Sequence, residues 1–159
     1  EAPAGTFSAV SAATYNVCGL DLTGKIVCWG ELTEVVDLGQ NKAPSGQFTS
    51  LSATVYTTCG VRSDGAVLCW GNNLDGQASP PSGAFQTVSA YGQITCGLRK
   101  DSQMVCWGNV VGAKDLQSPP PGPYAEVSTG SFHACGMRPT GAIICVGNDD
   151  AGQLTPPSN

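Results

Sequence analysis

The chain carries little charge and almost no histidine. Only 12% of its 159 residues are Asp, Glu, Lys or Arg, and there is one histidine. Seven Lys and Arg residues against twelve Asp and Glu residues give a formal net charge of −5 at pH 7. Phosphate backbones are bound by clustered basic side chains, which so few cations cannot provide. The composition therefore argues against nucleic acid or an anionic membrane as a partner.

Long apolar runs and helical patterning are also absent. No run approaches the roughly 20 apolar residues of a transmembrane helix, so no membrane insertion is expected. We find neither a leader pattern nor an Asn-x-Ser/Thr acceptor, and we expect a mature form beginning near Glu1 without N-linked glycans. The apolar runs are short and are broken by turn residues every eight to twelve positions. This pattern predicts an all-β fold.

The residues that catalysis usually requires are missing too. A nucleophile needs a base, and the lone His133 has no companion motif. Loop carboxylates occur at Asp75, Asp115, Asp149 and Asp150. Their spacing does not match a calcium-binding loop, and turn formation explains them as well. We therefore expect no enzymatic activity, no metal and no cofactor.

What the chain does contain is one motif repeated four times. In each repeat a Cys-Gly pair is followed, ten residues after the Cys, by a second Cys. The pairs are Cys18/Cys28, Cys59/Cys69, Cys96/Cys106 and Cys135/Cys145. The first cysteines are 41, 37 and 39 residues apart, a period that fits one small sheet per repeat. We place the repeats at 1–42, 43–79, 80–118 and 119–159.

A turn separates the two cysteines of each pair. In the second repeat the turn is Ser63-Asp64-Gly65, and Gly24 and Gly141 occupy the glycine position in the first and fourth repeats. A hairpin with a left-handed glycine places the two cysteines opposite each other. The third repeat has Ser102 at this position, so its loop is predicted to be strained or differently shaped.

Facing cysteines admit two interpretations, a cross-strand disulfide or half of a metal site. Zinc sites usually use Cys-x-x-Cys spacing, whereas nine residues separate the members of each pair here. Because every cysteine has a local partner, we favour four disulfides within the repeats. Disulfides at this density indicate an oxidising compartment, and hence a secreted or cell-surface protein.

The repeat resembles that of the regulator-of-chromosome-condensation family. The second repeat carries the resemblance best, with Leu51-Ser52-Ala53, Cys59-Gly60-Val61-Arg62-Ser63-Asp64-Gly65 and Cys69-Trp70-Gly71-Asn72-Asn73-Leu74-Asp75-Gly76-Gln77. The paired cysteines are closer to two extracellular branches, the Crinkly4-type receptor ectodomains of plants and secreted microbial proteins. The resemblance covers essentially the whole chain. It implies a β-propeller of four blades, each with about four short strands.

The number of blades in a closed ring is open, because the relatives generally have seven repeats and this chain has four. The C-terminal residues 152–158 repeat the pattern of residues 76–82, and residues 1–5 provide the start of a repeat. The termini thus look complementary. We favour a homodimer in which two chains close head to tail into an eight-bladed ring, over a single four-bladed ring or a fragment of a longer protein.

One loop position is a candidate ligand-binding site. Three residues before each first cysteine stand Tyr15, Tyr56, Gln93 and Phe132, and His133 follows the last of them. This position lies at the bend between the first two strands of a repeat, where aromatic side chains on one face of a ring could stack on sugars or anchor a protein. The alternative is that these side chains cover the inner strands. His133 matches a histidine common in the family's repeat and is expected to be structural.

Three tryptophans follow the second cysteines, at Trp29, Trp70 and Trp107, and Val146 takes this place in the fourth repeat. We expect the tryptophans to pack in the core rather than to contact ligand. The replacement of tryptophan by Val146 predicts that the terminal blade is packed differently.

A shared fold does not fix a shared activity, since relatives include a nucleotide-exchange factor that also binds chromatin, a bacterial inhibitor of β-lactamases and receptor ectodomains. Repetition of the loop position favours multivalent glycan binding, because equivalent weak sites gain avidity. The differences among the four loop tips favour a protein partner. We interpret the chain as a secreted, non-catalytic recognition protein, with lectin-like glycan binding slightly preferred over a protein-binding module such as an inhibitor or receptor ectodomain. A structural extracellular protein is the third interpretation.

Overall fold

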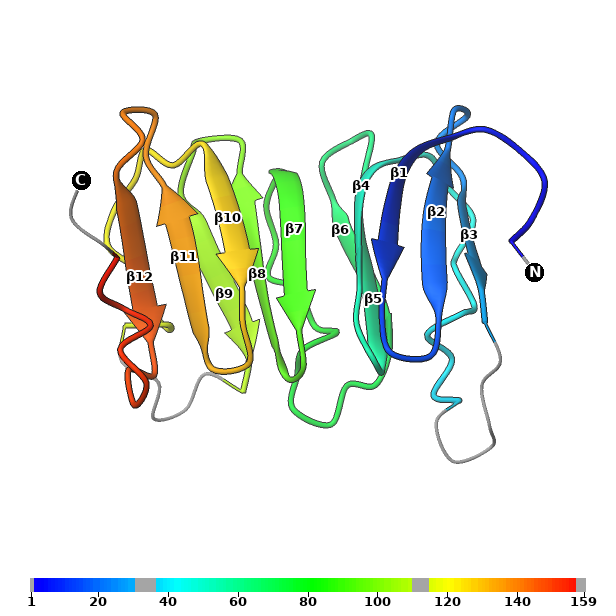
Figure 1. Cartoon of the computed structure of the whole chain (residues 1–159). Helices are drawn as coiled ribbons and strands as arrows, with labels where there is room; N and C mark the ends of the chain where they lie inside the picture. The colour runs from blue at the N-terminus through cyan, green and yellow to red at the C-terminus, as the bar shows by residue number, and fades with distance from the viewer. Residues whose placement is uncertain (1, 31–36, 110–114, 157–159) are drawn as a thin grey trace.

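The protein consists of four small antiparallel sheets arranged side by side in chain order (Figure 1). The computed structural model describes residues 2–30, 37–109 and 115–156. The strands are β1 (Phe7–Ala12), β2 (Val17–Asp21), β3 (Ile26–Trp29), β4 (Phe48–Ala53), β5 (Thr57–Arg62), β6 (Val67–Gly71), β7 (Phe85–Tyr91), β8 (Ile94–Arg99), β9 (Met104–Gly108), β10 (Glu126–Thr129), β11 (His133–Met137) and β12 (Ile143–Gly147). Parts of both predicted complementary termini, residues 1 and 157–158, lie outside the described residues.

Each sheet is one propeller blade of three strands, where the family resemblance implied about four. The orders are β1-β2-β3, β4-β5-β6, β7-β8-β9 and β10-β11-β12. After the third strand the described chain forms turns, for example through the bonds from Gly76 N to Asn73 O and from Ser79 N to Gly76 O. Backbone groups used in such turns are not available for a fourth ladder, so the predicted fourth strand is wrong for the described residues.

The four predicted disulfides are confirmed. In every blade the two cysteines lie directly opposite each other on the second and third strands. All four pairs are bonded, with Cα–Cα distances of 4.0 to 4.1 Å: Cys18–Cys28, Cys59–Cys69, Cys96–Cys106 and Cys135–Cys145. No cysteine is left free to bind a metal ion, so the disulfide interpretation holds and the metal interpretation is wrong.

The two cysteines of a pair differ in burial. The first cysteines of the first three blades, Cys18, Cys59 and Cys96, are fully buried. Their partners lie on the third strand and are less covered, because Cys28 is half-buried and Cys106 is 9% exposed. Each of these disulfides therefore links a buried middle strand to the more exposed third strand of its blade.

The turn of the third blade keeps the shape of the others. Ser102 has φ of 63°, beside 84°, 92° and 88° for Gly24, Gly65 and Gly141. Its backbone N–H donates to Arg99 O at 2.9 Å, and Gly65 N donates to Arg62 O in the same way. The loop is thus strained rather than differently shaped, because a residue with a Cβ occupies the left-handed region.

Neighbouring blades are joined by the same two hydrogen bonds at each internal interface, one to a serine side chain and one to a backbone carbonyl. A serine of one first strand accepts a bond from the backbone of the next first strand: Ala53 N to Ser11 Oγ, Ala90 N to Ser52 Oγ and Thr129 N to Ser89 Oγ, at 2.9 to 3.0 Å. A turn carbonyl accepts a second bond: Phe48 N to Gly24 O, Phe85 N to Gly65 O and Tyr124 N to Ser102 O. These repeated bonds fix the position of each blade relative to the next.

Apolar packing also runs between blades rather than within a single central core. Val61 and Val67 of the second blade, for example, form one buried cluster with Phe85 and Val88 of the third. Similar clusters join the first blade to the second and the third to the fourth. An internal blade is therefore covered on both faces by its neighbours, which is how repeat arrays are stabilised.

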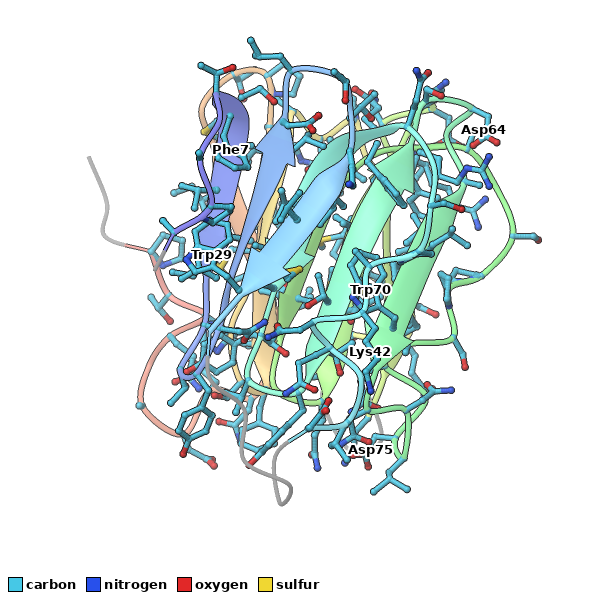
Figure 2. The ribbon with its side chains drawn as sticks, turned by 90° about the vertical axis from the view of Figure 1, so that its right-hand side faces the viewer. Phe7, Trp29, Lys42, Asp64, Trp70 and Asp75 are labelled. Atoms are coloured by element: carbon cyan, nitrogen blue, oxygen red, sulfur yellow. A yellow bond between two sulfur atoms is a disulfide. The ribbon has the colours of Figure 1, made fainter. Side chains whose placement is uncertain are left out.

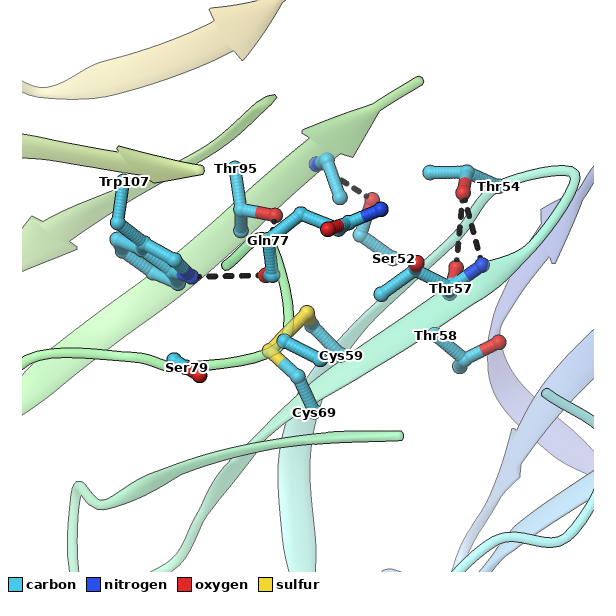
Figure 3. The surroundings of a disulfide bond; sticks show 12 residues. Ser52, Thr54, Thr57, Thr58, Cys59, Cys69, Gln77, Ser79, Thr95 and Trp107 are labelled. Carbon is cyan, nitrogen blue, oxygen red and sulfur yellow. Dashed lines mark hydrogen bonds between the residues drawn. A yellow bond between two sulfur atoms is a disulfide. The ribbon is translucent and has the colours of Figure 1, made fainter. Parts of the chain in front are cut away.

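A loop glutamine connects two of the three tryptophans, Trp70 and Trp107, to the preceding blade. Trp107 Nε1 and Thr95 Oγ1 both donate to Gln77 O, at 2.9 and 3.0 Å (Figure 3). Trp70 and Thr58 donate to Gln40 O in the same manner. In the fourth blade the three positions are Leu116, Ala134 and Val146, which are buried together. All three hydrogen-bonding residues, glutamine, threonine and tryptophan, are thus replaced together by apolar residues. This replacement accounts for the different packing of the terminal blade.

Candidate functional site

The loops between the first and second strands of all four blades lie at one end of the molecule, along the lower edge in Figure 1. We call this end the inner-loop face and define it by residues 12–16, 53–56, 91–93 and 130–132. Each loop is short because the two strands that it joins are paired in an antiparallel ladder up to the bend. The predicted bend positions are therefore held at fixed places by regular strands.

Aromatic side chains stand exposed at this end of every blade. The exposed fractions are 47% for Tyr15, 39% for Tyr56, 54% for Tyr91 and 55% for Phe132. The first two and the last are the predicted aromatics, and the structure places them in solvent rather than over the inner strands. Tyr91 was not predicted. It ends the first strand of the third blade, where the aligned residue is Gln93, so this blade presents its aromatic two residues earlier.

The two remaining predicted residues have local structural contacts. Gln93 is exposed, and its Oε1 accepts a hydrogen bond from Asn109 Nδ2 at 3.2 Å. His133 is half-buried and its ring lies against Gly130, where an added Cβ would collide with the imidazole. His133 thus has a packing contact within its own loop.

A hollow of about 400 Å³ lies between the inner ends of the first three blades. It is lined by Ala12, Ala13, Thr14, Ala53, Thr54, Val55, Tyr91 and Gly92. None of the five predicted site residues lines it, so the structure places them beside the hollow rather than in it. One sequence signal could have indicated it, because Tyr91 stands where the other repeats have the small residues Ala13, Thr54 and Gly130.

The lining is apolar and carries no charged side chain. The Thr54 hydroxyl donates to Thr57 O at 3.0 Å and accepts from Thr57 N at 3.1 Å, so both of its roles are used within the loop (Figure 3). Thr14 and Tyr91 supply the other side-chain hydroxyls of the lining. Few free polar groups and a large apolar wall suit an apolar side chain better than a polar small molecule.

Metal-ligating side chains do not gather in the described part of the chain, where no three His, Cys, Asp or Glu residues could hold one ion. Across the same ranges there is no helix of the length and apolarity needed to cross a membrane.

Comparison with known proteins identifies the repeat. Residues 48–77 match the Regulator of chromosome condensation (RCC1) repeat. A search of curated proteins finds no match.

Three solved structures show how far the likeness extends. The chain is similar to the CRINKLY WD40 ectodomain of the Arabidopsis thaliana receptor kinase ACR4, with 30% identity and a TM-score of 0.71 over 89% of this chain and 51% of that one. It is similar to the ectodomain of the Physcomitrella patens receptor kinase CR4, with 28% identity and a TM-score of 0.70 over 89% and 39%. Prp20p from Saccharomyces cerevisiae is 14% identical, with a TM-score of 0.72 over 100% and 50%, and shows the fold alone.

The chain thus spans about half the length of these relatives, or less. Its second blade carries the matched repeat, and the other three blades have the same strand order and the same cysteine register. The four sheets of this chain are therefore RCC1-type β-propeller blades.

Proposed function

We propose that this chain is a non-catalytic recognition module that binds an apolar side chain of an extracellular protein partner in the hollow of its inner-loop face. The observation that carries the proposal is the uncharged lining, in which Ala53, Val55 and Tyr91 supply apolar wall. Apolar and aromatic contacts in a desolvated pocket provide most of the binding energy in protein interfaces. Tyr15 and Tyr56 stand exposed on neighbouring loops and extend the contact surface beyond the hollow.

The chemistry of the chain and its relatives supports an extracellular partner. Four disulfides persist in oxidising compartments. Two similar chains are ectodomains of receptor kinases. A more distant similar chain, Prp20p, binds the proteins Gsp1p and histones. Binding of proteins by a chain of this fold therefore has a precedent in Prp20p.

Glycan binding is the second candidate, and one observation favours it. An exposed aromatic stands at the inner-loop face of every blade, and sugars stack on such rings. However, the residues beside the predicted positions are Asn16, Thr57, Ile94 and His133, so the polar groups that would orient a sugar are not repeated. The hollow is formed by three blades jointly, and its apolar wall is not a feature that each blade repeats.

A titration with two small probes tests both candidates. N-acetyl-tryptophanamide presents one apolar side chain on a peptide backbone, and chitotriose presents linked sugar rings. We expect the amide signals of Ala53 and Gly92 to shift with the first probe and not with the second, when followed by nuclear magnetic resonance. Binding of chitotriose alone would favour the glycan candidate. No shift with either probe would contradict the proposed site.

Substitution of Tyr91 provides the matched test. Tyr91→Ala should weaken binding of N-acetyl-tryptophanamide by about tenfold, the effect expected for loss of an aromatic wall. Its melting temperature should stay close to that of the parent chain, because the Tyr91 side chain is exposed. Leu74→Ala, at an exposed residue outside the lining, is the control and should change neither the affinity for N-acetyl-tryptophanamide nor the melting temperature. A Tyr91→Ala chain that binds normally would exclude Tyr91 from the site.

A further inference from the structure

The loops that follow the third strands lie against the inner-loop face. In the second, third and fourth blades a backbone N–H of this loop donates to a carbonyl at the bend of the same blade: Asn72 N to Tyr56 O, Asn109 N to Gln93 O and Asn148 N to Phe132 O, at 2.7 to 2.9 Å. After the first blade, Gln40 Nε2 donates to the carbonyl of Val55, which lines the hollow. Charges carried by these loops are therefore placed at the end of the molecule that holds the hollow.

Carboxylates outnumber cations in these loops. The described loop residues include one cation, Lys42, and the carboxylates of Asp37, Asp75, Asp115, Asp149 and Asp150. Lys42 Nζ lies 3.6 Å from Asp37 Oδ2, so these two charges offset each other. The other carboxylates form no ion pair within the part of the chain that the structure describes. This end of the molecule is therefore acidic.

The other described cations lie at the opposite end. They are Lys25, Arg62, Arg99, Lys100 and Arg138, in or beside the turns that join the second and third strands, together with Asp21, Asp64 and Asp101. Figure 2 shows Asp64 and Asp75 at opposite ends of the molecule. A strand of five or six residues spans about 17 to 20 Å, whereas the Debye length is about 8 Å at physiological ionic strength. The distant cations therefore do not neutralise the carboxylates beside the hollow.

Hydrogen bonds connect Asp75 to the rim of the hollow. Gly92 lines the hollow, and the side chain of the neighbouring Gln93 accepts a bond from Asn109 Nδ2 at 3.2 Å. The same amide nitrogen lies 3.5 Å from Asp75 Oδ1. Asp75 is half-buried, and its Oδ2 accepts no hydrogen bond within the described ranges. One carboxylate oxygen is thus held near the rim and remains available to a partner.

We propose that the partner segment bound by the inner-loop face carries lysine or arginine next to the apolar side chain that enters the hollow. This inference rests on the proposed function and adds the charge of the partner to it. The lining of the hollow has no charged side chain, so it selects by apolar contact alone. The carboxylate of Asp75 supplies the electrostatic part, because a long basic side chain keeps its head in water while it pairs at the rim.

The carboxylates act on the partner as separate charges rather than as one ion site. They belong to different loops, and among the described residues no three His, Cys, Asp or Glu side chains come together as ligands for one ion. Separate exposed charges of one sign attract a partner of the opposite sign and disfavour a partner of the same sign. A basic segment is therefore the occupant that this face favours over an acidic one.

Two tripeptides that differ only in charge test the proposal. N-acetyl-Lys-Trp-Lys-amide and N-acetyl-Glu-Trp-Glu-amide present the same indole to the hollow. Binding is followed through the amide signals of Ala53 and Gly92 by nuclear magnetic resonance. We expect the lysine peptide to bind about tenfold more tightly in about 20 mM salt. The preference should fall to about twofold in about 500 mM salt, because salt screens exposed charges.

A pair of charge-matched variants locates the effect. Asp75→Asn should reduce the preference for the lysine peptide about threefold, the effect of losing one exposed charge pair. Asp101→Asn removes the same charge at an exposed residue of the third-blade turn, at the end opposite to the hollow. It should leave the preference at the parent value. Both variants should keep the parent melting temperature, since both side chains lie in loops or turns.

The outcomes separate this proposal from the proposed function. Binding of both peptides with equal affinity would overturn the basic partner and leave the hollow as an apolar site. Failure of both peptides to bind would overturn the proposed function, and this inference with it. A preference that falls equally in Asp75→Asn and Asp101→Asn would reflect only the net charge of −5, and it would overturn the role of Asp75 at the rim.

Discussion

Reduction of the four disulfides is expected to unfold the chain at temperatures where the oxidised protein is fully folded. Each disulfide joins residues ten positions apart. Closing a loop of this length contributes about 2 to 3 kcal/mol by restricting the unfolded chain. Small domains have total stabilities of only about 5 to 15 kcal/mol, so losing four such contributions removes most of the stability.

The measurement is thermal unfolding by circular dichroism with and without a phosphine reductant. Two variants then locate the effect within the array. Cys59→Ala with Cys69→Ala opens an internal blade, where Cys59 is fully buried. Cys135→Ala with Cys145→Ala opens the terminal blade, where both cysteines are only partly buried. Replacing the internal pair should lower the melting temperature more than replacing the terminal pair, because it also disturbs packing with the next blade. Equal melting of reduced and oxidised protein would show that the disulfides are not needed for stability.

The cysteines and turn glycines of the sequence predicted most of the fold. Their ten-residue spacing determined the hairpin register, and Ser102 in place of glycine predicted a loop that is either strained or differently shaped, of which the structure has the first. Both features depend on residues close together in the chain, so local rules apply to them. The strand number was wrong because it came from the family resemblance and not from the residues themselves.

Tyr91 could have indicated one wall of the hollow, but the hollow as a whole could not be predicted, because it depends on how the blades are rotated relative to one another. Its walls come from three loops, around residues 13, 54 and 92, that are distant in sequence. Their distances follow from inter-blade bonds such as that from Ala53 N to Ser11 Oγ, which no local pattern indicates. The sequence showed only part of the replacement of glutamine, threonine and tryptophan by Leu116, Ala134 and Val146. Val146 stands in line with the tryptophans, but its two partners become apparent only when each glutamine loop is aligned with the blade that follows it.

Phe85→Ala is expected to have the largest effect of any single substitution considered for this chain. The ring is buried and lies over Gly97, where an added Cβ would collide with it. It packs against Trp107 at a centroid distance of 6.0 Å, and the Arg99 guanidinium lies 5.4 Å from its centre. Removing a buried phenyl ring costs about 3 to 5 kcal/mol, since the rigid surroundings cannot collapse into the space. Urea unfolding followed by tryptophan fluorescence measures the loss.

Phe7→Ala is the matched control, because Phe7 has similar contacts within its own blade. Its ring packs over Gly19, and Trp29 lies at a centroid distance of 5.9 Å. Two features differ. The preceding blade packs against Phe85, whereas no blade precedes Phe7 in this structure. In addition, Arg99 stands opposite Phe85, whereas Asp21 stands opposite Phe7, so the Phe7 ring has no such cation beside it. In the isolated chain the substitution should therefore cost less, about 1 to 2 kcal/mol. An equal loss of unfolding free energy for Phe7→Ala and Phe85→Ala would show that contacts within the blade dominate.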